Sequence, residues 1–157
     1  MIYKYSILTI DPGIHTGVAY WKTGMKLPET HQFNISNCPR TDALKVCDAM
    51  RKIKEIPFTC DKKTSVYIEG VQVWSGSLVS MTSATRGNLS TLAYLVGAYV
   101  ANFVDKTEHV EILPPSWKGQ LNYDALAVWV KKATGEEYKS EHILSAVGMN
   151  LKVRGLL

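Results

Sequence analysis

The sequence has few cysteines and no long apolar run. Its three cysteines, Cys38, Cys47 and Cys60, are odd in number and show no CxxC spacing, which argues against both a disulfide framework and a structural zinc site. No stretch approaches the roughly 18 consecutive apolar residues of a membrane-spanning helix, and the first residues lead into a strand pattern instead of a signal peptide. We therefore expect a soluble, cytoplasmic protein with reduced thiols and no membrane partner.

Internal repeats, linkers and low-complexity tracts are also absent. With 157 residues, of which 46% are hydrophobic, the chain can build one packed core, so we expect a single domain that spans residues 1–157. Lysine and arginine number 18 against 14 acidic residues, which gives a formal charge of +4. This modest excess suits a polyanionic partner without requiring one.

The most informative stretch runs from Ile7 to Trp21. A short, largely β-branched run ends in Asp11, and an extended pattern resumes at Val18 after a gap that holds one proline and two glycines. This pattern predicts a hairpin that carries one carboxylate at its mouth. The glycines permit positive φ or a close approach of backbone on either side of the acid.

Three interpretations of this hairpin are open at this point. Asp-Pro-Gly is an ordinary turn sequence in which the Asp side chain bonds nearby backbone. The hairpin is also typical of a nuclease strand whose Asp binds a divalent metal, and of the phosphate-binding hairpin of an actin-like or sugar-kinase-like ATPase. The length argues against the ATPase, which needs two such domains around its nucleotide.

A second strand repeats this arrangement, because the apolar run of residues 65–69 ends in Glu69. The remaining periodicity predicts further strands near 32–35 and over 109–113, and helices from residue 42, over 89–104, over 123–133 and over 140–151. The predicted order is three strands, a helix, a strand, a helix, a strand and two helices.

The spacing of apolar residues also predicts which helix faces point inward. The helix that begins at Asp42 would bury Leu44, Cys47, Met50 and Ile53, and the helix over 123–133 would bury Leu126, Trp129, Val130 and Ala133. The helix over 89–104 is apolar around much of its circumference. We expect it to be deeply buried or shared with a second subunit.

The element order, with an acid at the end of the first and fourth strands, resembles the ribonuclease H-like nuclease fold, and the motifs resemble the RuvC branch of Holliday-junction resolvases. In that family the first strand carries Asp-Pro-Gly followed by Thr-Gly, which is matched by Asp11-Pro12-Gly13 and Thr16-Gly17. The family's second acid is matched by Glu69. Phage-type members also resemble Trp117-Lys118-Gly119-Gln120-Leu121. The resemblance covers nearly the whole chain and implies an α/β fold with a mixed five-stranded sheet flanked by helices.

The chain departs from the family in its last helix, which usually carries an Asp or His, two residues, and then Asp-Ala. His142 takes the first of these positions, but Ser145 stands where the family has its last essential Asp. We hypothesise that metal affinity is weakened, or that Glu141 supplies the missing carboxylate, because it lies four residues earlier on roughly the same helix face.

The resemblance implies metal-dependent hydrolysis of DNA. Asp11, Glu69 and His142 would be the metal ligands and catalytic groups, with Mg²⁺ as the natural ion and Mn²⁺ as a possible substitute. The expected partner is a four-way junction or other branched DNA, cut during recombination, replication or phage DNA processing. Because a junction has two symmetric strands to cut, the resemblance also implies a homodimer, for which the helix over 89–104 is the expected interface.

Three further residues are predicted to contact DNA. Lys118 and Arg86 each lie in a loop near a predicted strand end, where they would contact phosphate. Trp74 follows the Glu69 strand, where relatives carry an aromatic residue that probes the junction. Two other functions stay open: a junction-binding protein that has lost cleavage through Ser145, and a ribonuclease or fork-specific nuclease with the same site chemistry.

Overall fold

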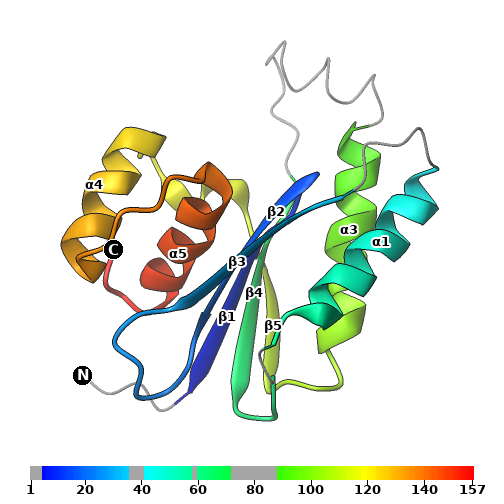
Figure 1. Cartoon of the computed structure of the whole chain (residues 1–157), viewed down its shortest axis with the longest axis horizontal. Coiled ribbons are helices and arrows are strands. Elements are labelled where there is room, and N and C mark those ends of the chain that lie inside the picture. Colours follow the sequence, from blue (N-terminus) through cyan, green and yellow to red (C-terminus); the bar gives the residue numbers. More distant parts are fainter. Residues whose placement is uncertain (1–4, 36–40, 58–59, 72–87) are drawn as a thin grey trace.

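The computed structural model describes residues 5–35, 41–57, 60–71 and 88–157. In this part of the chain a five-stranded sheet separates two pairs of helices (Figure 1). The strands are β1 (Ser6–Asp11), β2 (His15–Trp21), β3 (Glu29–Asn34), β4 (Thr64–Glu69) and β5 (His109–Leu113). The helices are α1 (Asp42–Glu55), α3 (Asn88–Phe103), α4 (Tyr123–Thr134) and α5 (Glu141–Val153), and a 3-10 turn, η1 (Pro115–Lys118), follows β5.

The sheet is mixed, with the strand order β3-β2-β1-β4-β5. β1, β2 and β3 form an antiparallel meander, whereas β4 runs parallel to both β1 and β5. Ile10 of β1 lies opposite Ile68 of β4, and the next residues are Asp11 and Glu69. The predicted order of elements and the mixed five-stranded sheet are therefore confirmed, and the two acids lie at the same edge of the sheet.

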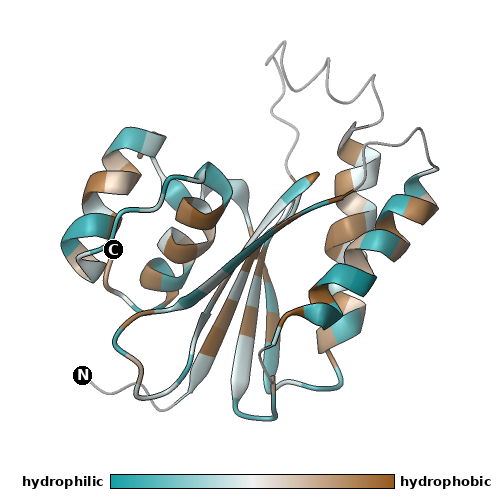
Figure 2. Cartoon of the chain, viewed as in Figure 1, coloured by the Kyte–Doolittle hydropathy of each residue, from teal (hydrophilic) through white to brown (hydrophobic). Residues whose placement is uncertain are grey.

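One face of the sheet is covered by α1 and α3 (Figure 1). The core on this side combines strand residues with four side chains of α3: Leu95, Val96, Tyr99 and Phe103. The inward face predicted for α1 is partly wrong, because Leu44 is 50% exposed and Cys47 is also exposed. α1 instead packs through Val46, Ala49, Met50 and Ile53, which follow the i, i+3, i+4, i+7 spacing of a single stripe. Figure 2 shows the resulting alternation of polar and apolar bands on α1.

The opposite face is covered by α4 and α5 (Figure 1). Every residue of α5 from Leu144 to Leu151 is buried, because this helix lies between the sheet and α4. The prediction for α4 is right for Leu126 and Val130 and wrong for Trp129 and Ala133, which are exposed. Leu126 and Val130 lie one turn apart and contact α5, and that orientation turns the Trp129 ring outward, where it lies 5.3 Å from the Lys132 ammonium.

Buried polar groups join α5 to the centre of the sheet. The Thr9 hydroxyl of β1 donates to the carbonyl of Ala146 at 2.7 Å, and the Asn150 amide donates to the carbonyl of Ile7 at 3.1 Å. Such groups are costly to bury without partners, so they favour one seating of the helix on the sheet. This seating determines where the first turn of α5 lies relative to β1.

The close approach of α5 to β2 requires glycine at position 17. A Cβ atom added at Gly17 would lie 2.2 Å from the carbonyl oxygen of His142. The pairing of Gly17 with Asp11 in the sheet register therefore brings the start of α5 to the end of β1. No helix in the described ranges is long and apolar enough to cross a membrane.

Candidate active site

Asp11 and Glu69, which we call the carboxylate pair, lie at the carboxyl ends of two adjacent parallel strands. Their side chains are 13% and 12% exposed, so both carboxylates are largely withdrawn from water. Together they line a cavity of about 220 Å³, which Gly70 and Pro115 also border. The ends of parallel strands in an α/β sheet are common places for such clefts.

The first turns of α5 bring His142 and Ser145 to this edge. Ser140 is the N-cap of α5, and its hydroxyl accepts a hydrogen bond from the amide of Ile143. His142 Nδ1 lies 3.1 Å from Asp11 Oδ2, and the Ser145 hydroxyl donates to Glu69 Oε2 at 3.3 Å. Each member of the carboxylate pair therefore has one partner on α5.

Lys118 also reaches the carboxylate pair. After β5, the chain turns through η1, whose start is favoured by Pro114 and Pro115, and Gly119 follows with a φ of 61°. This turn puts the Lys118 ammonium 3.7 Å from Glu69 Oε1. The same ammonium lies 5.0 Å from the ring centroid of Tyr123, so its position is constrained by a cation–π contact as well.

The electrostatics of the site are dominated by Glu69. Burial raises the pKa of this carboxyl, and the nearby Asp11 carboxylate raises it further. Lys118, the Trp117 indole and the Ser145 hydroxyl act in the opposite direction, because each favours the charged form. A carboxylate that is disfavoured by burial and by a second carboxylate is stabilised when a cation binds between them.

The pKa of the His142 imidazole is also raised, but by different interactions. Its hydrogen bond with Asp11 raises the pKa of the imidazole, partial burial lowers it, and the charges of Asp11 and Glu141 raise it further. Asp11 thus stabilises the charged form of His142 relative to the neutral form. A protonated His142 can donate a proton or a hydrogen bond at this edge of the sheet.

The buried indole of Trp117 was not predicted as part of the site. Its ring packs where Gly148 leaves space, since a Cβ added at Gly148 would lie 3.0 Å from the ring. Within the described residues the indole nitrogen has no hydrogen bond of standard geometry, yet it lowers the pKa of Glu69 as a more distant donor. The only signal in the sequence was its place next to Lys118 in the Trp-Lys-Gly motif.

The other predicted residues are distributed differently. Glu141 is exposed at the first residue of α5, one turn before the buried Ser145, and the structure does not bring it beside the carboxylate pair. Trp74 and Arg86 lie outside the described residues. His15 was not predicted, although it belongs to the same hairpin as Asp11; its ring centroid lies 5.6 Å from that of His142.

The oxygen donors of the pair fit a hard divalent cation. Magnesium commonly binds through one or two carboxylates together with waters and substrate phosphates. In the described part of the chain, no group of three or more His, Cys, Asp or Glu side chains is arranged as a metal site.

An antiparallel meander followed by parallel β4 and β5, with acids at the ends of β1 and β4, defines a ribonuclease H-like fold. Two solved structures are similar to this chain: RuvC of Thermus thermophilus in complex with a Holliday junction substrate, and a second structure of RuvC from the same organism. The first has a TM-score of 0.68 at 16% identity, covering 94% of this chain and 91% of that chain. The second has a TM-score of 0.63 at 18% identity, covering 94% and 92%. The chain thus has the fold of RuvC.

Sequence comparisons add no closer relationship. No protein-family model matches the chain, and no curated protein shows significant sequence similarity to it.

Proposed function

We propose that this chain is a metal-dependent, structure-selective DNA endonuclease that cuts four-way junctions during recombination, replication or phage DNA processing. The observation that carries the proposal is the carboxylate pair at adjacent strand ends, with the raised pKa of Glu69, in a chain with the fold of RuvC. Metal-assisted phosphodiester hydrolysis requires protein groups that hold a divalent ion at the scissile phosphate, and carboxylate oxygens suit such an ion.

Asp11 and Glu69 would hold Mg²⁺, or Mn²⁺ in its place. A bound ion of this kind activates water and stabilises charge on the leaving oxygen. His142 would orient the attacking water or donate to the phosphate, since its pKa is raised beside Asp11. Lys118 would contact a backbone phosphate, because its ammonium lies 3.7 Å from Glu69 Oε1 and its side chain is 18% exposed. Arg86 and Trp74 are proposed to contact DNA on the sequence argument alone.

A homodimer is part of the proposal. The outward face of α3 includes Ala93, Tyr94, Gly97 and Ala101, and the exposed Val104 directly follows its last residue. None of these residues carries a charge, and the Tyr94 and Val104 side chains are 60% and 54% exposed. An uncharged helix face of this kind suits a symmetric contact with a second copy.

The direct test is cleavage of a labelled synthetic four-way junction compared with a linear duplex of the same sequence. We expect junction-selective cleavage in Mg²⁺ or Mn²⁺, and a loss of at least about a hundredfold in the Asp11→Asn variant because one of the two metal-binding carboxylates is removed. Equal cleavage of junction and duplex would contradict structure selectivity. Cleavage that persists in Asp11→Asn would contradict the site.

A second candidate function is a junction-binding protein with impaired cleavage. The observation that favours it is Ser145, which is fully buried and offers Glu69 a neutral hydroxyl where the family pattern has a carboxylate. The site therefore holds one formal negative charge fewer with which to bind a cation. Tight junction binding without cleavage in either metal would favour this alternative.

The variant Ser145→Asp separates the two functions. If the parent does not cut and Ser145→Asp does, the parent is a binder; if both cut, the serine is compatible with catalysis. The matched control is Ser145→Asn, which adds nearly the same volume without the charge. We expect Ser145→Asp to bind Mg²⁺ more tightly than Ser145→Asn in a calorimetric titration, because a third carboxylate strengthens a hard-cation site.

A further inference from the structure

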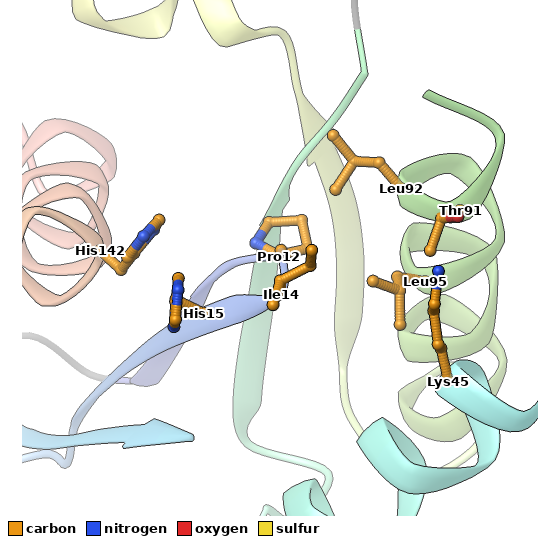
Figure 3. Close-up of a pocket in the computed structure, with 9 residues that line it drawn as sticks. Pro12, Ile14, His15, Lys45, Thr91, Leu92, Leu95 and His142 are labelled. Atoms are coloured by element: carbon orange, nitrogen blue, oxygen red, sulfur yellow. The ribbon is translucent and has the colours of Figure 1, made fainter. Parts of the chain in front are cut away.

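A second cavity, of about 320 Å³, adjoins the carboxylate pair (Figure 3). His15 and His142 lie on one side of it, Leu92, Leu95 and Lys45 lie on the other, and Pro12 and Ile14 lie between them. This volume is near the lower end of the range for small-ligand pockets, about 300 Å³. It is suited to one planar ring system.

The walls of this cavity, which we call the hairpin pocket, are mostly apolar. Pro12, Ile14, Leu92 and Leu95 supply aliphatic surface, and Ile14 is 44% exposed at the mouth. The imidazoles of His15 and His142 are tilted 35° relative to each other. Flat aromatic faces and aliphatic side chains are the usual surroundings of an unstacked nucleobase.

The polar groups of the pocket bear on whether its ligand is a nucleobase or an anion. The Lys45 ammonium lies 3.5 Å from the Asp42 carboxylate, and the Thr91 hydroxyl donates to the same carboxylate at 2.6 Å. Because the charge of Lys45 is already paired, its attraction for a phosphate is weakened. An ammonium nevertheless has three donors, so Lys45 can still donate to a carbonyl oxygen or ring nitrogen of a base.

The hairpin pocket and the carboxylate pair share a wall. Pro12 and Leu92 line both cavities, and Pro12 directly follows Asp11 in the chain. His142 lines the pocket and contacts Asp11. A nucleotide whose phosphate lies at the carboxylate pair would therefore have its base within reach of the pocket.

We propose that the hairpin pocket binds one unpaired nucleobase of the DNA strand being cut, next to the scissile phosphate, and so determines a base preference at the cut site. This inference rests on the proposed nuclease function for its biological role, but binding of a base does not require cleavage. A base at a branch point, where the ends of the duplex arms meet, is stacked on fewer neighbours than a base inside a duplex, so less energy is needed to unpair and extrude it.

The test begins with binding alone. Single-stranded DNA trinucleotides that differ only in the central base, and one with an abasic central position, are titrated into the protein while the methyl NMR signals of Ile14 and Leu92 are followed. We expect saturable shifts with at least one base and affinity at least about fivefold weaker for the abasic trinucleotide, because stacking of one base contributes a factor of this order or more.

Two variants locate the binding. Ile14→Ser removes apolar surface from the mouth of the pocket, and Lys45→Met removes the donor while keeping the stem. Each should weaken trinucleotide binding about fivefold, with the shift of Leu92 as the readout. The matched controls are Val128→Ser, an exposed apolar residue of α4, and Lys54→Met, a lysine of α1 that borders a different groove. Both controls should bind like the parent.

Cleavage is then measured on four-way junctions that differ only in the bases beside the cut. Two results together support both the nuclease and the hairpin pocket. The NMR signals of Ile14 and Leu92 shift, and cutting depends on the base in the parent but not in Lys45→Met. Shifts without cleavage support the pocket and contradict the nuclease. Cleavage with no shifts, or a base preference that persists in both pocket variants, overturns the pocket and leaves the nuclease standing. If the protein shows neither NMR shifts nor cleavage, both proposals are overturned.

Discussion

At the scale of single residues, the hydrogen bond between His142 and Asp11 makes the protein sensitive to pH. Asp11 raises the pKa of His142 above its ordinary value of about 6.5. Protonated His142 therefore stabilises the folded state, and this contribution is complete below about pH 6.5 and is lost as the pH rises through the folded-state pKa. The contribution is modest, because the side chain is 36% exposed.

We predict that the free energy of unfolding falls less in the His142→Asn variant than in the parent between about pH 6 and about pH 9. Urea denaturation at the two pH values, without divalent ions, measures this difference. Asp11→Asn is the companion variant, since it keeps the imidazole and removes its partner, and it should flatten the pH dependence in the same way. The prediction is wrong if the parent and both variants lose stability equally.

At the scale of elements, the contact between β2 and α5 controls the geometry of the site. The backbone of His142 lies against Gly17, where an added Cβ would be 2.2 Å from the carbonyl oxygen and 2.3 Å from the carbonyl carbon. Backbone atoms cannot rotate away as a side chain end can. A larger residue at position 17 must therefore move the first turn of α5, and with it His142 and Ser145.

We predict that Gly17→Ala destabilises the fold by about 1–3 kcal/mol, the usual cost of overpacking a well-packed contact. It should also reduce junction cleavage, because His142 and Ser145 move away from the carboxylate pair. The matched control is Gly97→Ala in α3, where the added methyl meets nothing within 4 Å and should stabilise the helix by about 0.5–1 kcal/mol. Urea denaturation of dilute protein compares the two; equal stabilities would contradict the prediction.

Local pattern was sufficient to predict the elements and the two acids, because the strand that ends in Asp11 and the strand that ends in Glu69 are each specified by a few consecutive residues. The orientation of Trp129 was not predictable in this way, since apolar residues on neighbouring sides of a helix compete and the packing of α4 on α5 decides between them. The contacts of Lys118 and Trp117 with Glu69 are long-range. They depend on how η1 crosses the sheet edge, which no local spacing encodes.

At the scale of the whole molecule, the helices on the two faces of the sheet contribute differently to the candidate site and to the outer surface. α4 and α5 cover one face, and α5 supplies a partner for each member of the carboxylate pair. α1 and α3 cover the other face and leave an uncharged outer surface on α3. A dimer formed through that surface would present two sites, as the two symmetric strands of a four-way junction require.

We predict that Tyr94→Glu converts a dimer into a monomer, because it places a charge in the middle of an apolar contact. Sedimentation equilibrium at micromolar concentrations gives the mass of each protein. The control is Val128→Glu, which makes the same kind of change at an exposed apolar residue of α4 and should stay dimeric. A monomeric parent across the micromolar range would rule out this interface.

The long sequence separations within the site have a consequence for synthesis on the ribosome. His142 and Asp11 are 131 positions apart, and Ser145 and Glu69 are 76 apart. All five strands are translated before α5, so until α5 emerges the apolar side chains of β2 that it covers, Ala19 and Trp21, have no cover from that helix. A nascent chain therefore acquires the partners of its carboxylates and the cover of its sheet in one late step. An interrupted translation product would therefore keep this sheet face uncovered, and exposed apolar surface of this kind favours aggregation.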